Sequence, residues 1–161
     1  MPVVNAVIYG FLAATAALLL AVLFLTGMPN GAAQMSAPED WLSLSVTLLF
    51  FFSFLEEGSK WIFFRQLHKQ IMERFTPPSP LTMGMLFGLG FSSLEVGLIV
   101  FGLKSFDLFP LLGIIFLQTL TSLFYAYYLF RQAPRTLFHT VFLVFFVSAL
   151  HLAYNLFALR S

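Results

Sequence analysis

The stretch FSFLEEGSKWIFF, residues 52–64, places two adjacent carboxylates, Glu56 and Glu57, and the ammonium of Lys60 inside a mostly apolar block. On membrane-insertion scales, a charged side chain at the centre of a helix costs about 2.5–3.5 kcal/mol, so the three together cost roughly 8–10 kcal/mol. The surrounding apolar residues return about 4–8 kcal/mol, which leaves insertion of this helix near break-even. We therefore expect the three groups to face a bundle interior or water, where intramembrane charges usually serve a function.

The composition of the whole chain points to the same environment. Of its 161 residues, 60% are hydrophobic and only 9% are charged, whereas a soluble domain carries about 25% charged residues. This indicates an integral membrane protein that forms a single membrane domain over residues 1–161. The net charge of +1 argues against a nucleic-acid partner, and the absence of cysteine excludes disulfides and thiolate metal sites.

Five apolar blocks divide the sequence, and each is close to the ~20 residues that cross ~30 Å of hydrocarbon. They cover residues 3–25, 41–64, 81–103, 108–130 and 136–159. Backbone polar groups in lipid must bond internally, and the alternating pattern of a membrane barrel is absent, so we predict an all-α polytopic bundle with about five spans. The first five residues, Met1 to Asn5, include no Lys or Arg, so we interpret the first block as a retained helix, with a cleaved signal as the alternative.

Basic residues fall unequally on the two sides of such a bundle. Five lie on one side and two on the other: Arg65, Lys69, Arg74, Arg131 and Arg135 against Lys104 and Arg160. Because cytoplasmic loops carry the excess of Lys and Arg, we predict a cytoplasmic N-terminus and an external C-terminus. The helical spacing of Leu67, Ile71 and Phe75 indicates that the second helix continues into the cytosol or lies at the interface, and a solvated helix end is the simpler interpretation.

The third block carries Glu95, which has no cation within one helical turn and therefore needs a partner on another helix or a proton. Phe91 lies one turn before it on the same helix face. Four of the five glycines in this block permit close contact between helices, and packing explains them most simply: Gly84, Gly88, Gly90 and Gly97.

The last block contains HLAYN, which puts His151 and Asn155 on one helix face. Histidine can serve as acid, base or metal ligand, and asparagine can donate to a developing oxyanion. The alternative role for His151 is an interhelical hydrogen bond. A hydrogen bond of the same kind accounts for Gln118 in the fourth block without catalysis. Counted inward at 1.5 Å per residue, Glu56, Glu95, Gln118 and His151 lie at comparable depths of roughly 12–23 Å. The spacing therefore predicts one buried polar site assembled from four helices.

Three motifs occur in chain order within residues 45–159: EEGSK fits EExxK, FSSLE fits FxxxE and HLAYN fits HxxxN. This set, with each motif inside a span, resembles the PrsW family of intramembrane proteases, which is related to the CAAX prenyl endopeptidases and to bacteriocin-processing membrane proteases. The resemblance implies hydrolysis of a peptide bond in a membrane-protein or lipid-linked peptide substrate. One residue departs from the family pattern, because Gln118 stands where members usually have a histidine.

The resemblance also implies roles for the residues in these motifs. Glu56 would act as general base on a water molecule, Glu57 and Lys60 would orient and tune it, and Glu95 and His151 would position the water or pass its proton. The implied catalytic and supporting residues are Glu56, Glu57, Glu95, His151 and Asn155, with Lys60, Phe91 and Gln118 in support.

Alternatives remain for both the metal and the function. A zinc ion could be held by Glu56, Glu95 and His151, although we favour a metal-free glutamate mechanism without a cofactor. Gln118 would suit a catalytically inactive relative that acts as a membrane scaffold or substrate-binding partner. A small transporter with the carboxylates as its ion pathway is a third class, which predicts an internal repeat that the sequence does not show.

Overall fold

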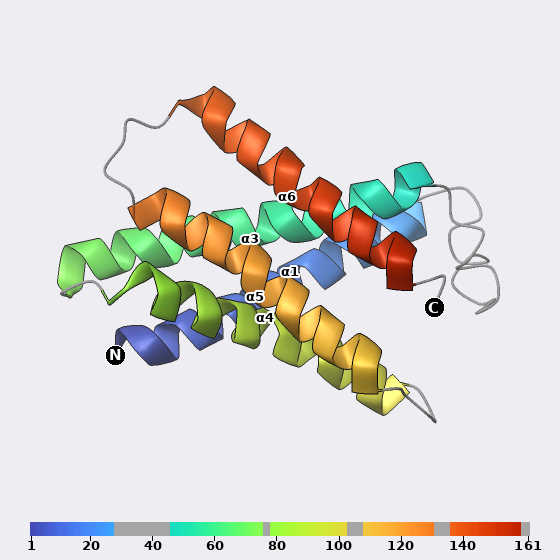
Figure 1. The fold of residues 1–161 in the computed structure, drawn as a ribbon, viewed down its shortest axis with the longest axis horizontal. Helices are drawn as coiled ribbons and strands as arrows, with labels where there is room; N and C mark the ends of the chain where they lie inside the picture. Colours follow the sequence, from blue (N-terminus) through green and yellow to red (C-terminus); the bar gives the residue numbers. More distant parts are fainter. Residues whose placement is uncertain (28–45, 76–77, 103–107, 131–135, 159–161) are drawn as a thin grey trace.

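The computed structural model describes residues 1–27, 46–75, 78–102, 108–130 and 136–158, and these form five α-helices (Figure 1). The helices are α1 (Pro2–Gly27), α3 (Val46–Arg74), α4 (Pro80–Gly102), α5 (Leu108–Phe130) and α6 (Leu137–Ala158). The predicted all-α helix bundle is therefore confirmed. Residues 41–45 of the predicted second span, residue 103 of the third and residue 159 of the fifth lie outside the described part of the chain.

Four of the described helices, α1, α4, α5 and α6, are long and apolar enough to cross a membrane. Large apolar side chains are exposed along all of them, as lipid contact requires. The remaining helix, α3, has 29 residues and carries the charged stretch; at 1.5 Å per residue it is roughly 43 Å long, more than the ~30 Å of a bilayer core. The chain is a multi-pass integral membrane protein.

Helix α3 runs through the middle of the bundle. It packs against α1, α5 and α6, while α4 packs against α1 and α5. Successive helices run in opposite directions, so α1, α4 and α6 are roughly parallel to one another and α3 and α5 return between them (Figure 1). Glu57 and Lys60 are fully buried, so their charges face these neighbouring helices rather than lipid.

The C-terminal part of α3 continues beyond the predicted span, as the spacing of its apolar residues indicated. Leu67 and Ile71 are fully buried in the main apolar core, whereas Arg65 and Lys69 are exposed. Phe75 follows the helix and is 41% exposed, so it does not join this core. The extension is thus amphipathic, with one face packed on the bundle and the other exposed and charged.

Small residues set the crossing of α1 and α4. A Cβ atom added to Gly10 would collide with the backbone carbonyl oxygen of Phe87, and one added to Gly90 would collide with that of Val7. Only glycine allows two helix backbones to approach this closely. Gly90 confirms a predicted close contact, while the role of Gly10 was not predicted.

The contact between α4 and α5 uses two of the other predicted glycines. A Cβ atom on Gly88 would lie 2.5 Å from Thr119 Cα, and one on Gly84 would lie 2.9 Å from Leu123 Cα. The predicted packing role is confirmed for both. A Cβ atom on Gly97 would have no described atom within 4 Å, so the structure gives this glycine no packing role.

Candidate functional site

A buried ion pair lies in the middle of α3. Lys60 Nζ is 2.6 Å from Glu57 Oε1, and both side chains are completely buried. The ammonium also donates to Gln118 Oε1 and, at 2.9 Å, to Thr121 Oγ1 on α5, and it lies 4.5 Å from the ring centroid of Phe91 on α4. Partners on three helices offset the desolvation of this cation.

The imidazole of His151, on α6, lies between the two adjacent glutamates. Its Nδ1 atom forms a 2.9 Å hydrogen bond with Glu57 Oε1, and its Nε2 atom is 3.2 Å from Glu56 Oε2. The second contact is within ion-pair range but is not aligned as a hydrogen bond, since Glu56 Oε2 is a buried oxygen with no hydrogen-bond partner among the described residues. His151 therefore joins α6 to both carboxylates of α3.

Gln118 connects the buried cation to the carboxylate of α4. Its Oε1 atom accepts from Lys60, and its Nε2 atom donates to Glu95 Oε2 at 2.6 Å. We predicted that Glu95 needs a partner on another helix, and Gln118 on α5 is that partner. A glutamine amide offers an acceptor and donors together, as a neutral histidine does, so Gln118 reproduces the bridging capacity of a histidine but not its ability to carry a proton.

Asn155 follows His151 by one helical turn and lies beside α3. Its Nδ2 atom donates to Ser53 Oγ at 3.4 Å, a long hydrogen bond. Ser53 is itself 1% exposed. The sequence analysis identified Asn155 but not Ser53, because a single serine among Phe and Leu residues carries no distinctive spacing.

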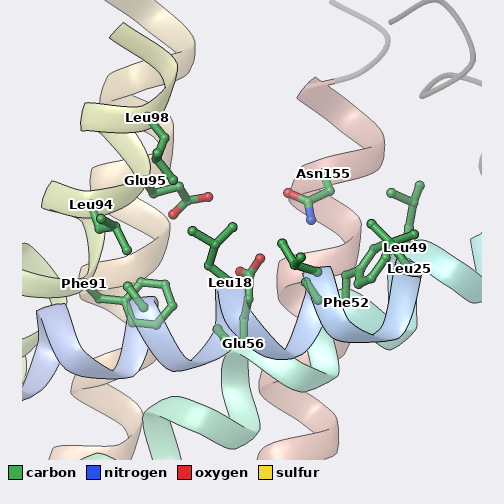
Figure 2. Close-up of a pocket in the computed structure, with 14 residues that line it drawn as sticks. Leu18, Leu25, Leu49, Phe52, Glu56, Phe91, Leu94, Glu95, Leu98 and Asn155 are labelled. Atoms are coloured by element: carbon green, nitrogen blue, oxygen red, sulfur yellow. The ribbon is translucent and has the colours of Figure 1, made fainter. Parts of the chain in front are cut away.

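A cavity of about 520 Å³ lies next to this network. Its polar lining residues are Glu56 of α3, Glu95 of α4 and Asn155 of α6, and Figure 2 shows their polar ends directed into the space. The remaining lining side chains are apolar and come from α1, α3 and α4. Polar groups from three helices therefore meet at one apolar-walled cavity, which is how small-molecule and substrate sites are usually built.

The structure divides the eight predicted residues between two layers. Glu56, Glu95, Asn155 and Phe91 line the cavity. The other four lie behind it in the buried network: Glu57, Lys60, Gln118 and His151. The side chain of Glu56 is 30% exposed and that of Glu57 is not exposed at all, so the acid pair is split between the two layers.

The proposed zinc ligands do not have the arrangement of a metal site. Within the described ranges, no group of three or more His, Asp or Glu side chains is placed to hold a metal ion. Glu56 and His151 adjoin each other, but Glu95 is engaged by Gln118. A catalytic zinc site needs three ligands at about 2.0–2.2 Å from one point, so this set does not fit the ion and we derive no step through it.

Two contributions to the site were not predicted. Tyr125 is fully buried on α5, and its hydroxyl donates to the backbone carbonyl of Glu57 at 3.3 Å. Helix α1 carries none of the motifs, yet Ala14, Ala17 and Ala21 line the cavity. The recurrence of alanine every three to four residues was the available signal, because it marks a helix face with little side-chain bulk.

These features define the class as a multi-pass membrane protein with a buried ion network beside an apolar-walled cavity. Comparison with protein-family models, with curated proteins and with solved structures finds no match to this chain. Its function therefore has to be argued from the residues of the site and from the motifs that they form.

Proposed function

We propose that the chain is a PrsW-like intramembrane peptidase that hydrolyses a peptide bond of a membrane-associated substrate with a glutamate-activated water. One observation carries this proposal. Glu56 lines a cavity inside a membrane bundle, one of its oxygens has no hydrogen-bond partner among the described residues, and His151 Nε2 lies 3.2 Å from that oxygen. A general base and a neighbouring proton carrier are what peptide hydrolysis by water requires.

The proposed reaction begins when Glu56 removes a proton from water as the water oxygen attacks the scissile carbonyl carbon. The new C–O bond creates a tetrahedral oxyanion, to which Asn155 Nδ2 donates; such a donor contributes about 2.7–4 kcal/mol in a known protease. The C–N bond then breaks, and the proton held by Glu56 or His151 passes to the leaving amine. Glu95 accepts a hydrogen bond from the water and orients its lone pair.

The buried layer supports these steps without touching the substrate. Glu57 accepts from His151 Nδ1 and from Lys60, which directs Nε2 of the imidazole at Glu56. Gln118 holds Glu95 by its 2.6 Å hydrogen bond. No step passes a proton through Gln118, so the replacement of the family histidine is compatible with activity.

The alternative proposal is a catalytically inactive relative that binds a membrane protein as a scaffold. Gln118 is the observation that favours it, because an amide cannot titrate as the family histidine would. Under this alternative the cavity would still hold a peptide segment, but the segment would leave intact.

Reconstitution in nanodiscs tests the two proposals against each other. We expect the wild-type protein to cleave members of a library of single-span substrates, and we expect Glu56→Gln and His151→Ala to abolish cleavage. Glu73→Gln is the matched control, since this carboxylate is on the same helix but 57% exposed. A chelator should leave the rate unchanged. No turnover of any substrate, with stable co-purification of a membrane partner, would favour the scaffold, and ion flux in liposomes would favour a transporter.

We also propose a cytoplasmic N-terminus. The exposed Arg65, Lys69 and Arg74 lie at the C-terminal end of α3, on the same side of the bundle as the N-terminus (Figure 1), and an excess of basic residues marks the cytoplasmic side. Because the chain has no cysteine, Gln66→Cys provides a unique label site. A membrane-impermeant maleimide should label it only after the cells are permeabilised, and labelling of intact cells would reverse the orientation.

A further inference from the structure

Exposed side chains of both α1 and α4 line the cavity. These helices cross at Gly10 and Gly90 and separate towards their C-terminal ends (Figure 1). Beyond the crossing, Leu18 on α1 and Leu98 on α4 both line the cavity, and they are 41% and 49% exposed (Figure 2). A side chain that is exposed and also lines a cavity marks its rim. Since the exposed side chains on these helices are apolar, we expect this rim to meet acyl chains rather than water.

The wall of the cavity on the α1 side is made of small side chains. Ala14, Ala17 and Ala21 lie on one face of the helix and line the space opposite Glu56 and Glu95. Methyl groups leave room where larger residues would fill it. The resulting volume of about 520 Å³ falls in the range of about 300–1,000 Å³ that is usual for ligand sites.

We propose that the substrate enters sideways from the lipid through the gap between α1 and α4. The unwound peptide segment of the substrate then lies against the alanine face of α1, formed by Ala14, Ala17 and Ala21. This inference rests on the proposed peptidase function as far as cleavage is concerned. It gives α1, the one described helix that carries none of the predicted site residues, the role of a substrate-binding wall and gate.

The polar lining favours a polypeptide over a lipid chain as the occupant. A membrane-embedded segment that unwinds for cleavage exposes backbone N–H and C=O groups, which need partners because lipid offers none. Glu56 and Glu95 can accept from the N–H groups, and Asn155 can donate to a C=O group. An acyl or isoprenoid chain has no hydrogen-bond donors, so its binding would remove water from the Glu56 carboxylate without replacing the lost hydrogen bonds, which is costly.

Cross-linking Leu18 to Leu98 tests whether the substrate enters between α1 and α4. In the cysteine-free chain, Leu18→Cys with Leu98→Cys can be joined by a bis-maleimide that contains a reducible disulfide. We expect the joined protein to lose at least tenfold in cleavage rate and to recover after reduction. The control pair is Phe124→Cys with Phe146→Cys, whose native ring centroids lie 6.0 Å apart across α5 and α6; joining it should leave cleavage unchanged. Full activity of the protein joined at the rim would overturn the proposed route.

Filling the wall tests the binding surface. Ala21→Phe places a ring in the cavity, whereas Ala149→Phe places the same ring on an exposed position of α6. We expect the first change to raise KM or abolish cleavage at an unchanged melting temperature, and the second to have no effect. Equal cleavage by both variants would refute the role of the alanine face.

A photo-cross-linker separates this inference from the proposed chemistry. We expect p-benzoylphenylalanine in place of Leu18 to capture a single-span peptide, while the same group in place of Leu20, which is 45% exposed and outside the cavity lining, captures lipid only. Capture of the peptide without any cleavage would uphold the binding site and refute the peptidase. Equal peptide capture at both positions, or capture of an acyl chain alone at Leu18, would refute the binding site.

Discussion

Glu56 and Glu57 are neighbours on α3, but Glu56 lines the cavity while Glu57 is sealed behind it against Lys60. The separation follows from helix geometry, since successive residues are rotated by about 100° around the axis. The side chain of Glu56 therefore points to the cavity, and the side chain of Glu57 points to α5 and α6. His151 contacts both carboxylates, at 3.2 Å and 2.9 Å, and so couples the exposed acid to the buried one.

The first prediction separates the two glutamates by their effects. Glu56→Gln should abolish cleavage with little change in stability, because its Oε2 atom forms no hydrogen bond with the described residues and the amide is close to the carboxylate in size. Glu57→Gln should destabilise the protein by about 3–5 kcal/mol, the usual effect of removing one partner of a buried ion pair. Thermal unfolding in detergent and a cleavage assay on the same preparations measure both effects.

The double substitution Glu57→Gln with Lys60→Met is the control for this pair. Removing both charges should restore part of the stability that Glu57→Gln alone loses, because no uncompensated ammonium is left in the core. If the double variant is less stable than either single variant, the destabilisation does not come from the unpaired charge.

The second prediction concerns Gln118. Gln118→Leu removes the acceptor for Lys60 and the donor to Glu95, and each buried group left without its partner costs about 1–3 kcal/mol. Gln118→His keeps one donor and one acceptor, so it should lose less stability and retain cleavage. Comparison of the two melting temperatures and cleavage rates checks this. Wild-type stability of the leucine variant would show that the bridge contributes nothing.

Much of this architecture was predictable from hydropathy. The blocks at residues 81–103 and 108–130 match α4 and α5 to within a residue at each end, because a bilayer imposes both the length and the apolarity of a span. The convergence of Glu95 and Gln118 was also predictable, since a polar group in lipid requires a partner at its own depth.

Other features depend on tertiary packing that the sequence does not encode locally. Lys60 can reach a carboxylate three or four residues earlier, and only the rotation of α3 against α5 selects Glu57. Gly88 and Gly97 look alike in the sequence, but only Gly88 faces another backbone. The alanines of α1 recur on one helix face, but only the packing of α1 on α3 and α4 places that face at the cavity.

The third prediction concerns Asn155. Asn155→Ala should lower kcat by about 10²–10³-fold, the effect of removing one oxyanion donor. It should change stability little, because the hydrogen bond to Ser53 is long at 3.4 Å. Ser53→Ala removes the same hydrogen bond but keeps the amide, so it should preserve most of kcat. Equal losses in the two variants would mean that Asn155 acts only through Ser53.

The fourth prediction compares two glycines of α4 with the same substitution. In Gly88→Ala the new methyl would lie 2.5 Å from Thr119 Cα and 2.8 Å from the carbonyl oxygen of Gln118, so α4 and α5 must move apart at a cost of about 1–3 kcal/mol. In Gly97→Ala the methyl meets no described atom within 4 Å, and stability should rise by about 0.5–1 kcal/mol, since alanine is the better helix former. Because Gly88 packs on the segment that carries Gln118, its substitution should also weaken the hydrogen bond to Glu95 and slow cleavage, whereas Gly97→Ala should leave the rate unchanged. Thermal unfolding and cleavage rates measured on both variants check this, and equal stability of the two would contradict the close packing of α4 on α5.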